Sequence, residues 1–369
     1  MQCAERVIII RSATIWEMEA LMRLIKLTQT VEEGTVVTFA KVPARTGYVN
    51  QGWSSKKNSE KATAKAKCTV NKNITLYAVQ KKAVQLTFHR CDGSTWQKTT
   101  LAKGSSYSLP GVRDAEGYTF MGWSTKPMQS VSPQYEAEEK ITVNGNVDLY
   151  AVVFNRTTET DLTEDQLPQV DIYKYKQVIF VGDSRTEFME NVLTGMGESA
   201  TKNVKFVCSA GKGLDWFTTT GWAQLYSIVQ HDSNSILSKK TAVIFNFGVN
   251  DLSKSADYAE YYNWIAPQLK SKGCELYFMS VNPVNRLMLP NAGRADRSEA
   301  AVRSFNQYMK ANLSSAYTYI DMYSYLKSTG YSFASDHYGT GTVDDGLHYT
   351  TRTYKRIFAK CMDSLRVPA

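Results

Sequence analysis

The second half of the chain alternates apolar runs of high β-propensity with stretches of helical periodicity, and this alternation restricts the fold more than any other feature. The strand-like runs are Gln177–Val181, Val204–Cys208, Ala242–Phe247, Leu276–Val281 and Tyr317–Ile320. The helical stretches lie near Glu187–Thr194, Trp222–Val229, Ala256–Lys272, Arg297–Leu313 and Thr351–Leu365. Strands and helices that alternate in this way predict a parallel sheet covered on both faces, an α/β/α sandwich.

The first apolar run stops abruptly at Gly182-Asp183-Ser184. This pattern predicts a strand, a tight turn and a serine in the first turn of a helix. Amides at a helix N-terminus stabilise the negative charge that develops on an attacked carbonyl, so Ser184 is a candidate nucleophile, with a simple N-cap as the alternative. Gly213, Asn250 and the Asn282-Pro283 turn also follow strand ends, so we expect them to share one rim of the sheet with Ser184.

A catalytic serine needs a base and a carboxylate that orients the base. Among the four histidines, His348 lies in the segment Asp345-Gly-Leu-His348, directly before the last helical stretch. This spacing brings a carboxylate within reach of one imidazole nitrogen and leaves the other nitrogen to face the serine. Asp344 is a second candidate for the carboxylate, but the three-residue spacing favours Asp345.

Four segments, in chain order, resemble the sequence blocks of the SGNH/GDSL hydrolases. They are Gly182-Asp183-Ser184, the segment Cys208–Trp216, the segment Phe247–Asp251 and Asp345-Gly-Leu-His348. The resemblance covers about residues 172–369 and implies a flavodoxin-like three-layer α/β/α sandwich. It implies Ser184 as nucleophile, His348 as base and Asp345 as the orienting acid. The implied oxyanion donors are the backbone N–H groups of Ser184 and Gly213 and the side-chain amide of Asn250, and the implied chemistry uses no metal and no organic cofactor.

Some residues of these blocks leave alternatives open. Arg185 stands where the family often has Leu or Ile, and it either binds an anionic group of the substrate or pairs on the surface. Gly211 competes with Gly213 as the second oxyanion donor, and we prefer Gly213 because it precedes the helix start at Leu214-Asp215-Trp216. Trp216, together with Trp222 and Tyr338, is either a platform for a sugar or part of the packing. Asp251 is expected to cap a helix.

The first half of the chain contains an internal repeat. The segment from Gly47 to Ser54 returns as Gly117 to Ser124 at an offset of 70, and Leu76–Val79 returns as Leu149–Val152 at an offset of 73. Short β-rich runs and glycine turns predict two small sheet modules. The pattern resembles the Listeria–Bacteroides repeat of internalin-like bacterial surface proteins, whose β-grasp-like modules act as spacers or adhesive stalks.

In each module one tryptophan, Trp53 or Trp123, is expected to fill a thin core, with sugar binding as the alternative. The leading strand of the first module would come from Val7–Arg11, ahead of a segment of helical character at Trp16–Leu27. The predicted divisions are a first module over residues 1–80, a second over 81–154, a polar linker over 155–171 and a hydrolase-like domain over 172–369.

Composition excludes several classes of protein. The chain of 369 residues carries a formal net charge of +8, of which +7 lies in residues 1–155, but the basic residues are dispersed and predict a solvated surface rather than a nucleic-acid site. No window approaches the roughly 18 consecutive apolar residues that a membrane span needs. The six cysteines form no Cys-x-x-Cys pair, so metal-ligand spacing is absent, while a Cys68–Cys91 bridge stays open.

Together these features predict a serine esterase that removes ester groups, chiefly O-acetyl groups, from a polysaccharide or peptidoglycan through an acyl-serine intermediate. The alternatives are a lipase or thioesterase for longer acyl chains and a non-catalytic surface protein that binds glycan. The expected partner is an acylated carbohydrate or another small ester, with cell-surface or glycan contact through the repeats. The repeats favour an extracellular or cell-surface location, although the N-terminal segment has no signal-peptide pattern.

Overall fold

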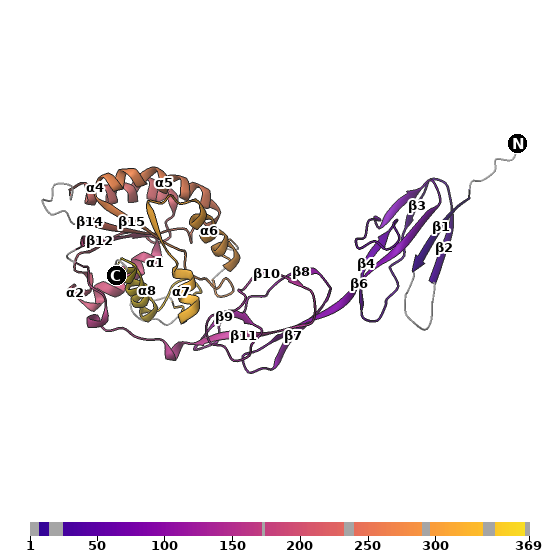
Figure 1. Ribbon diagram of the computed structural model, residues 1–369, viewed down its shortest axis with the longest axis horizontal. Helices are drawn as coiled ribbons and strands as arrows, with labels where there is room; N and C mark the ends of the chain where they lie inside the picture. Colours follow the sequence, from indigo (N-terminus) through magenta and orange to yellow (C-terminus); the bar gives the residue numbers. More distant parts are fainter. Residues whose placement is uncertain are drawn as a thin grey trace. The chain divides into compact units, whose positions relative to one another are not determined.

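The computed structural model describes residues 7–14, 25–171, 174–231, 240–289, 296–334 and 344–365 (Figure 1). The chain divides into two compact units. The smaller unit combines Met1–Phe88, Thr95–Tyr107 and Lys140–Asp148, and the larger unit combines His89–Ser94, Ser108–Glu139 and Leu149–Ala369. The second repeat therefore contributes residues to both units.

The strands of the two repeats correspond at the offsets seen in the sequence. In the first repeat they are β2 (Ile25–Glu32), β3 (Thr35–Thr38), β4 (Tyr48–Ser54), β5 (Lys67–Val70) and β6 (Ile74–His89). In the second repeat they are β7 (Thr95–Ala102), β8 (Ser105–Ser108), β9 (Tyr118–Ser124), β10 (Lys140–Val143) and β11 (Val147–Asn155). The first three strands of each set are 70 residues apart and the last two begin 73 residues apart, so the repeat is structural as well as sequential.

The repeated tryptophans belong to the interior of their modules. Trp53 Nε1 donates to the carbonyl oxygen of Ala40 at 2.6 Å, and Trp123 Nε1 donates to that of Pro110 at 2.8 Å. Their exposed fractions are 7% and 0%. Each indole is therefore buried with its one polar atom satisfied, which supports core packing over the sugar-platform alternative.

A strand does lie where the leading strand of the first repeat was expected. β1 (Val7–Thr14) pairs antiparallel with β2 and parallel with β6. The helical character predicted for Trp16–Leu27 is wrong at its end, because Ile25–Leu27 belongs to β2, and residues 15–24 lie outside the described residues. β6 is a single strand of 16 residues that leads from the first repeat into the second, and no glycine or proline interrupts it.

The larger unit contains a five-stranded parallel sheet, which confirms the predicted fold class. Its strands are β12 (Tyr175–Gly182), β13 (Val204–Cys208), β14 (Lys240–Asn246), β15 (Cys274–Met279) and β16 (Tyr317–Ile320). They lie in the order β13-β12-β14-β15-β16, and each neighbouring pair is parallel. This is the doubly wound order of flavodoxin-like sheets, in which β12 stands at the point where the order reverses.

Helices cover both faces of this sheet (Figure 1). They are α1 (Ser184–Met196), α2 (Glu198–Thr201), α3 (Leu214–Trp216), α4 (Trp222–His231), α5 (Ser255–Ser271), α6 (Glu299–Asn312), α7 (Met322–Thr329) and α8 (Thr351–Ser364). Side chains of β12 alternate between two cores: Ile179 and Val181 pack with α4, α5 and α6, whereas Val178 and Phe180 pack with α1, α7 and α8. Period-two alternation on a sheet buried from both sides explains why the strand is apolar throughout.

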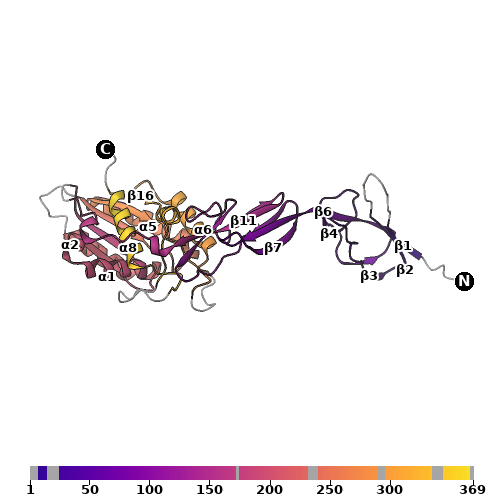
Figure 2. The same ribbon diagram turned by 90° about the horizontal axis from the view of Figure 1, so that it is seen from below.

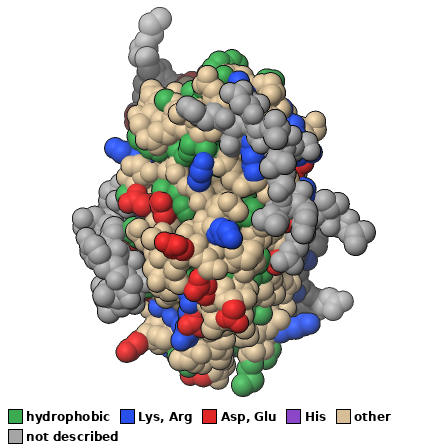
Figure 3. Space-filling model, turned by 90° about the vertical axis from the view of Figure 1, so that its left-hand side faces the viewer, with side chains coloured by type: hydrophobic (Ala, Val, Ile, Leu, Met, Phe, Trp, Pro, Cys, Tyr) green, Lys and Arg blue, Asp and Glu red, His purple; other side chains and the backbone are tan. Residues whose placement is uncertain are grey.

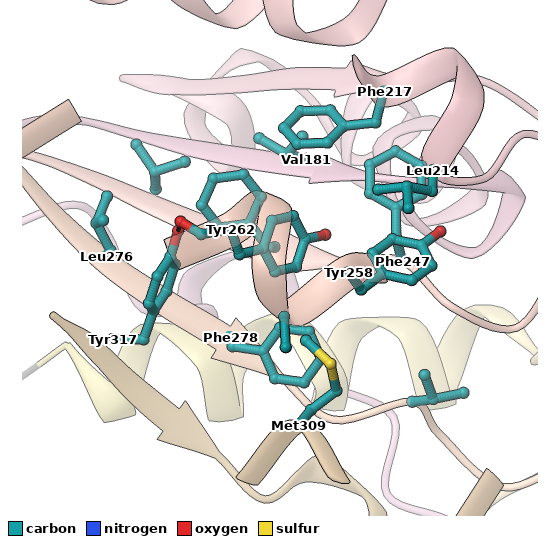
Figure 4. Packing of buried hydrophobic residues seen from close by; sticks show 14 of the residues in the cluster. Val181, Leu214, Phe217, Phe247, Tyr258, Tyr262, Leu276, Phe278, Met309 and Tyr317 are labelled. Carbon is teal, nitrogen blue, oxygen red and sulfur yellow. Dashed lines mark hydrogen bonds between the residues drawn. The ribbon is translucent and has the colours of Figure 1, made fainter. Parts of the chain in front are cut away.

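The two hydrophobic cores differ in the side chains that fill them. The core on the α5 side is rich in aromatic rings, and Figure 4 shows Phe217, Tyr258, Tyr262 and Phe278 lying between the helices and the sheet. In the perpendicular view of Figure 2, α1 and α8 cover the other face of the sheet. That second core also includes Met121, Val152 and Phe154 from the second repeat, so the repeat and the sheet share one hydrophobic interior.

Residues 155–171 were predicted to form a polar linker, and the structure corrects this interpretation. The carboxylate of Glu159 is buried and pairs with Arg356 Nη1 of α8 at 2.9 Å. Leu167 and Val170 are buried in the same core as α8. A polar, acidic segment can pack in this way because its buried carboxylate has a cationic partner, which composition alone does not reveal.

Three further expectations from the sequence concern a membrane span, the charged surface and the possible bridge between Cys68 and Cys91. Among the described residues, no helix is both long and apolar enough to cross a bilayer. The side of the molecule at the left of Figure 1 carries acidic and basic side chains interspersed with small apolar groups, as Figure 3 shows. Cys68 and Cys91 are both free thiols, so the bridge that the sequence left open does not form.

Candidate active site

The turn that presents Ser184 depends on a glycine. In β12, Gly182 pairs with Cys208 of β13 and Asn246 of β14, so it ends the central part of the sheet. A Cβ atom on Gly182 would collide with the Thr186 side chain and approach the Asn246 carbonyl oxygen. Glycine therefore allows the chain to turn from the strand into α1 without displacing either neighbour.

Asp183 caps the helix that begins at Ser184. Its side chain accepts from the Arg185 N–H at 3.0 Å, and its backbone carbonyl accepts from the N–H groups of Thr186 and Glu187 at 3.0 Å each. The Ser184 N–H is not one of these donors, which leaves it as a candidate oxyanion donor. Burial raises the pKa of Asp183 to about 6, against the opposing effect of the Arg185 charge. Ser184 is thus a helix residue, and the cap is its neighbour.

Ser184, His348 and Asp345 form one chain of hydrogen bonds. His348 Nε2 lies 2.9 Å from Ser184 Oγ, and His348 Nδ1 lies 2.6 Å from Asp345 Oδ2. An ionised carboxylate only accepts, so Nδ1 carries a proton and Nε2 of the neutral imidazole accepts from the serine hydroxyl. Residues 164 positions apart in the chain therefore meet with the geometry that general-base activation of a serine requires.

Asp345 is held in place by its own turn. Its Oδ1 accepts from the backbone N–H groups of Leu347 at 2.9 Å and His348 at 2.8 Å. Burial opposes the ionisation of this carboxyl, but the hydrogen bond and charge of His348 together with these amides outweigh it, so the pKa of Asp345 is lowered. Asp344, the other carboxylate considered for this role, bonds instead to Arg156 and to the Gly346 N–H.

The imidazole also has an aromatic neighbour. The ring of Phe188, in the first turns of α1, lies 4.3 Å from the His348 ring between centroids. The side chains of His348 and Asp345 are 13% and 16% exposed. Such partial burial limits the competition of bulk water for the hydrogen bonds while part of each side chain stays accessible.

Gly213 is closely covered by Asp251. A Cβ atom at Gly213 would collide with the Asp251 carboxylate, which accepts from the Leu214 N–H at 2.9 Å and from the Tyr258 hydroxyl at 2.7 Å. Asp251 was expected to cap a helix, and it does so at the distant start of α3 rather than at its own helix. Gly211 differs: its φ is +71° and a Cβ atom there meets nothing within 4 Å. Gly211 is therefore required by the positive φ of the turn, whereas Gly213 is required because the Asp251 carboxylate lies so close to it.

The Asn250 side chain is held at both ends. Its Nδ2 donates to the Lys212 carbonyl oxygen at 2.7 Å, and its Oδ1 accepts from Arg297 Nη2. An amide nitrogen carries two protons, so Nδ2 retains a second N–H for another acceptor. The guanidinium group fixes which way the amide points and, by its charge, favours further donation from Nδ2.

The predicted substrate contact of Arg185 is not supported. Its guanidinium group is buried and donates to the backbone carbonyls of Leu347, Asn282 and Pro283 at 2.9 to 3.0 Å. It lies over the Tyr349 ring, 5.2 Å from the centroid. Arg185 therefore neither forms an exposed ion pair nor binds an anion. Its guanidinium group instead ties α1 to the loop that carries His348 and to the Asn282-Pro283 turn.

Three aromatic residues were also considered as platforms for a sugar, and the structure describes two of them. Trp216 is partly buried and packs against Phe247, with centroids 6.1 Å apart, and Trp222 is also partly buried. Tyr338 lies outside the described residues. Within the part of the chain that the structure describes, no group of three or more His, Cys, Asp or Glu side chains is arranged to hold a metal ion.

Two functional candidates were missed at the sequence level. The sequence placed Arg297 only at the start of a helical stretch, and it did not single out Asp114 of the second repeat. No motif or spacing links either residue to the serine. Each could be found only by asking which side chains contact Asn250 and Asp344 in three dimensions.

Comparison with known proteins gives two family matches. Residues 178–361 match the family model of GDSL-like lipases/acylhydrolases. Residues 25–79 and 85–152 each match the Listeria-Bacteroides repeat domain. No curated protein sequence matches the chain.

Several solved structures are similar to about half of the chain. A protein described as an SGNH hydrolase from Slackia heliotrinireducens has 14% identity and a TM-score of 0.37, over 52% of this chain and 100% of that one. An acetyl xylan esterase has 10% identity and a TM-score of 0.35, over 52% and 100%. The catalytic domain of a Streptococcus pneumoniae peptidoglycan O-acetyltransferase has 16% identity and a TM-score of 0.31, over 52% and 92%.

These identities and TM-scores carry no conclusion about substrate. The family match rests instead on residues 178–361, which include the strand-turn-helix at Ser184 and the turn that carries Asp345 and His348. The chain belongs to the family of GDSL-like lipases and acylhydrolases through this region, and it is a hydrolase that carries two Listeria-Bacteroides repeats in its first half.

Proposed function

We propose that the chain is a serine esterase in which Ser184 is the nucleophile, His348 the general base and acid, and Asp345 the residue that orients and stabilises the imidazole. The observation that carries this proposal is the continuous hydrogen-bond chain from Ser184 Oγ through both nitrogens of His348 to Asp345. The lowered pKa of Asp345 supports it further, because an ionised carboxylate stabilises the imidazolium that forms during the reaction.

The first half-reaction forms an acyl-serine. Ser184 Oγ attacks the carbonyl carbon of the ester while its proton passes to His348 Nε2. The imidazolium then gives this proton to the oxygen of the leaving alcohol as the carbon–oxygen bond breaks. The alcohol departs and the acyl group remains on Ser184.

The second half-reaction returns the enzyme to its starting state. His348 Nε2 takes a proton from water as the water oxygen attacks the acyl carbon, and then returns the proton to Ser184 Oγ as that bond breaks. Asp345 stays ionised throughout. The products are a carboxylic acid, which loses its proton to the solvent at neutral pH, and a regenerated serine hydroxyl.

The oxyanion of each tetrahedral intermediate is assigned to three donors: the N–H of Ser184, the N–H of Gly213 and Nδ2 of Asn250. This assignment is supported by the parallel sheet, in which β12, β13 and β14 end at the same edge. Such donors act only while charge develops on the carbonyl oxygen, so each contributes to the rate rather than to ground-state binding.

The substrate is proposed to be an O-acetylated polysaccharide or peptidoglycan at an extracellular or cell-surface location. The support for this part is the pair of Listeria-Bacteroides repeats, a module of the kind found in bacterial surface proteins. The test compares p-nitrophenyl acetate with p-nitrophenyl decanoate, followed by acetate release from acetylated xylan and O-acetylated peptidoglycan. A preference for decanoate would replace the acetylesterase by a lipase or thioesterase.

A Ser184→Ala variant separates catalysis from simple glycan binding. We expect it to lose nearly all turnover while keeping the fold, because removal of a catalytic serine typically costs several orders of magnitude in kcat. Ser199→Ala, which changes an exposed serine of α2, is the matched control and should match the wild type. Equal turnover by wild type and Ser184→Ala would leave a non-catalytic surface protein as the better description.

A further inference from the structure

A closed ring of hydrogen bonds joins the second repeat to the loop that carries the candidate acid and base. Asp114 Oδ2 of the repeat lies 2.8 Å from Arg156 Nη2, and the same guanidinium nitrogen bonds to Asp344 Oδ2. Asp344 Oδ1 accepts from the Gly346 N–H at 3.0 Å. The Gly346 carbonyl accepts from the Asn285 N–H at 2.8 Å, and Asn285 Nδ2 returns to Asp114 Oδ1 at 2.8 Å. We call these five residues the Asp114 ring.

The Asp114 ring is built of side chains withdrawn from water. The side chain of Asp114 is 1% exposed, and those of Arg156 and Asp344 are 18% and 16% exposed. Two carboxylates share one guanidinium group, and burial together with the nearby charge of Asp344 raises the pKa of Asp114 to about 7. A buried arrangement of this kind is unstable if one member is removed, so it holds its geometry firmly when complete.

Gly346 shows how tightly the loop fits. Its φ is +66°, and a Cβ atom there would collide with the Asn285 carbonyl oxygen and come within 2.7 Å of the Met288 side chain. One residue further on, the Leu347 carbonyl accepts from Arg185 of α1. The backbone between Asp344 and His348 is therefore fixed from two sides, by the Asp114 ring and by the helix that begins at Ser184.

We propose that Asp114 of the second repeat and Arg156 are positioning residues for the ester hydrolysis: they hold Asp344, and through it the backbone that sets Asp345 and His348 opposite Ser184. This inference rests on the proposed function. It gives the second repeat a part in the active site, where its family resemblance implied only a spacer or stalk.

Other contacts join the Ser108–Glu139 part of the second repeat to the sheet domain within the larger unit. Lys327 of α7 donates to the Met121 carbonyl oxygen at 2.9 Å and pairs with Glu136 at 2.8 Å. Arg286 pairs with Glu138 at 3.0 Å. These contacts do not reach residues 344–348, and this makes one of them a suitable control.

The test compares Asp344→Ala and Asp114→Asn with Arg286→Gln in the full chain. Asp344→Ala removes the bond to Arg156 and the acceptor for the Gly346 N–H. Asp114→Asn replaces one of the two carboxylate oxygens, which accept from Arg156 Nη2 and Asn285 Nδ2, with an amide donor that cannot close the ring. Arg286→Gln removes an ion pair of the same interface that lies outside the Asp114 ring. Turnover of p-nitrophenyl acetate is measured for each variant and divided by the number of sites that react with a serine-directed fluorophosphonate.

We expect kcat per reactive site to fall between about 10- and 100-fold in both ring variants with KM changed by less than about twofold, because small displacements of a base cost rate rather than binding. Arg286→Gln should keep the kcat of the wild type. A merely structural role would lower the number of reactive sites and leave kcat per site unchanged.

Arg156→Ala provides a second measurement. Millimolar guanidinium ion should restore part of its turnover, because the ion can enter the gap and bridge Asp114 and Asp344 again. The proposal is overturned if the ring variants keep kcat per site within twofold of the wild type, or if KM rises while kcat stays the same. Failure of the wild type on every ester would instead reject the proposed function itself, so the two failures are distinguishable.

Discussion

At the scale of single residues, the candidate site consists of groups whose neighbours decide how they behave. Asn250 is an ordinary amide, yet Lys212 and Arg297 fix its orientation so that one N–H stays available. Asp183 is an ordinary N-cap, yet its complete burial changes its titration. Both effects arise from contacts between residues far apart in the sequence.

Arg297 is expected to act through Asn250. In Arg297→Met, Asn250 loses the donor to its Oδ1, and kcat should fall by about 10-fold, less than the 10²- to 10³-fold loss typical when an oxyanion donor is deleted. The measurement is a double-mutant cycle on ester turnover. In an Asn250→Ala background the Arg297 substitution should have little further effect, and full additivity would show that Arg297 acts by another route.

Asp183 should make the stability of the larger unit depend on pH. Its pKa is about 6 in the folded state against an ordinary value of 3.8, so the folded state binds the proton more tightly, and stability falls as the pH rises between about 4 and 6. Asp183→Asn keeps a cap acceptor but cannot ionise. Its stability relative to wild type should rise across that window by up to about 3 kcal/mol and then level off.

The measurement for Asp183 is urea unfolding at several pH values, followed by far-ultraviolet circular dichroism, to which the helices of the larger unit contribute. Wild type and Asp183→Asn should have similar midpoints below about pH 4, where the carboxyl is protonated in both folded and unfolded chains. Curves that stay parallel from pH 4 to pH 7 would contradict this account.

At the scale of elements, the site depends on where strands stop and helices start. β12, β13 and β14 end beside one another, and each is followed by a turn that presents a polar group. The start of α3 is capped from β14's loop by Asp251, so two of these turns are locked together. Because Asp251 lies against Gly213 but not against Gly211, the two glycines of the turn after β13 have different roles.

Gly213→Ala and Gly211→Ala should therefore behave differently. At Gly213 the new methyl group displaces the Asp251 carboxylate, and we expect a loss of at least about 10-fold in kcat because the start of α3 shifts. At Gly211 the φ of +71° makes alanine strained by about 1 kcal/mol, with nearly unchanged kcat. Melting temperature and ester turnover measured on both variants check this, and the opposite order of kcat losses would favour Gly211 as the oxyanion donor.

At the scale of the whole molecule, segments that the sequence suggests are separate share one interior. Residues 155–171 lie along α8, and the second repeat contributes Met121, Val152 and Phe154 to the core beneath α1 and α8. The larger unit therefore includes part of a repeat as well as the hydrolase region.

Glu159 should be the residue that fastens the 155–171 segment. Glu159→Ala leaves Arg356 buried without its partner, and we expect a loss of about 3–5 kcal/mol in the free energy of unfolding. Asp161→Ala removes a half-exposed carboxylate of the same segment, which pairs with Lys355 and Arg352 of α8, and should change stability by less than about 0.5 kcal/mol. Urea denaturation of both variants is the measurement, and equal effects would show that the segment is not fastened by the buried pair.

Much of the architecture follows from local pattern. Continuous apolar runs and helical spacing predicted five strands and most of the helices of the sheet domain, because a sheet buried on both faces forces its strands to be apolar. The short helix α7 was not predicted, since eight residues give little periodicity. The pairing of Ser184 with His348 and Asp345 was inferred from motif order, and the structure brings these three side chains into contact.

The residues themselves decided the strands, the turn at Gly182, the repeat and the chemical types gathered at the strand ends, because these depend on neighbours within a few positions. The folded chain alone decided that Arg185 binds carbonyls, that Arg297 holds Asn250, and that Asp114 reaches the loop before His348. Buried charges must find partners wherever the fold supplies them, and those partners lie tens to hundreds of positions away, beyond the reach of any local pattern.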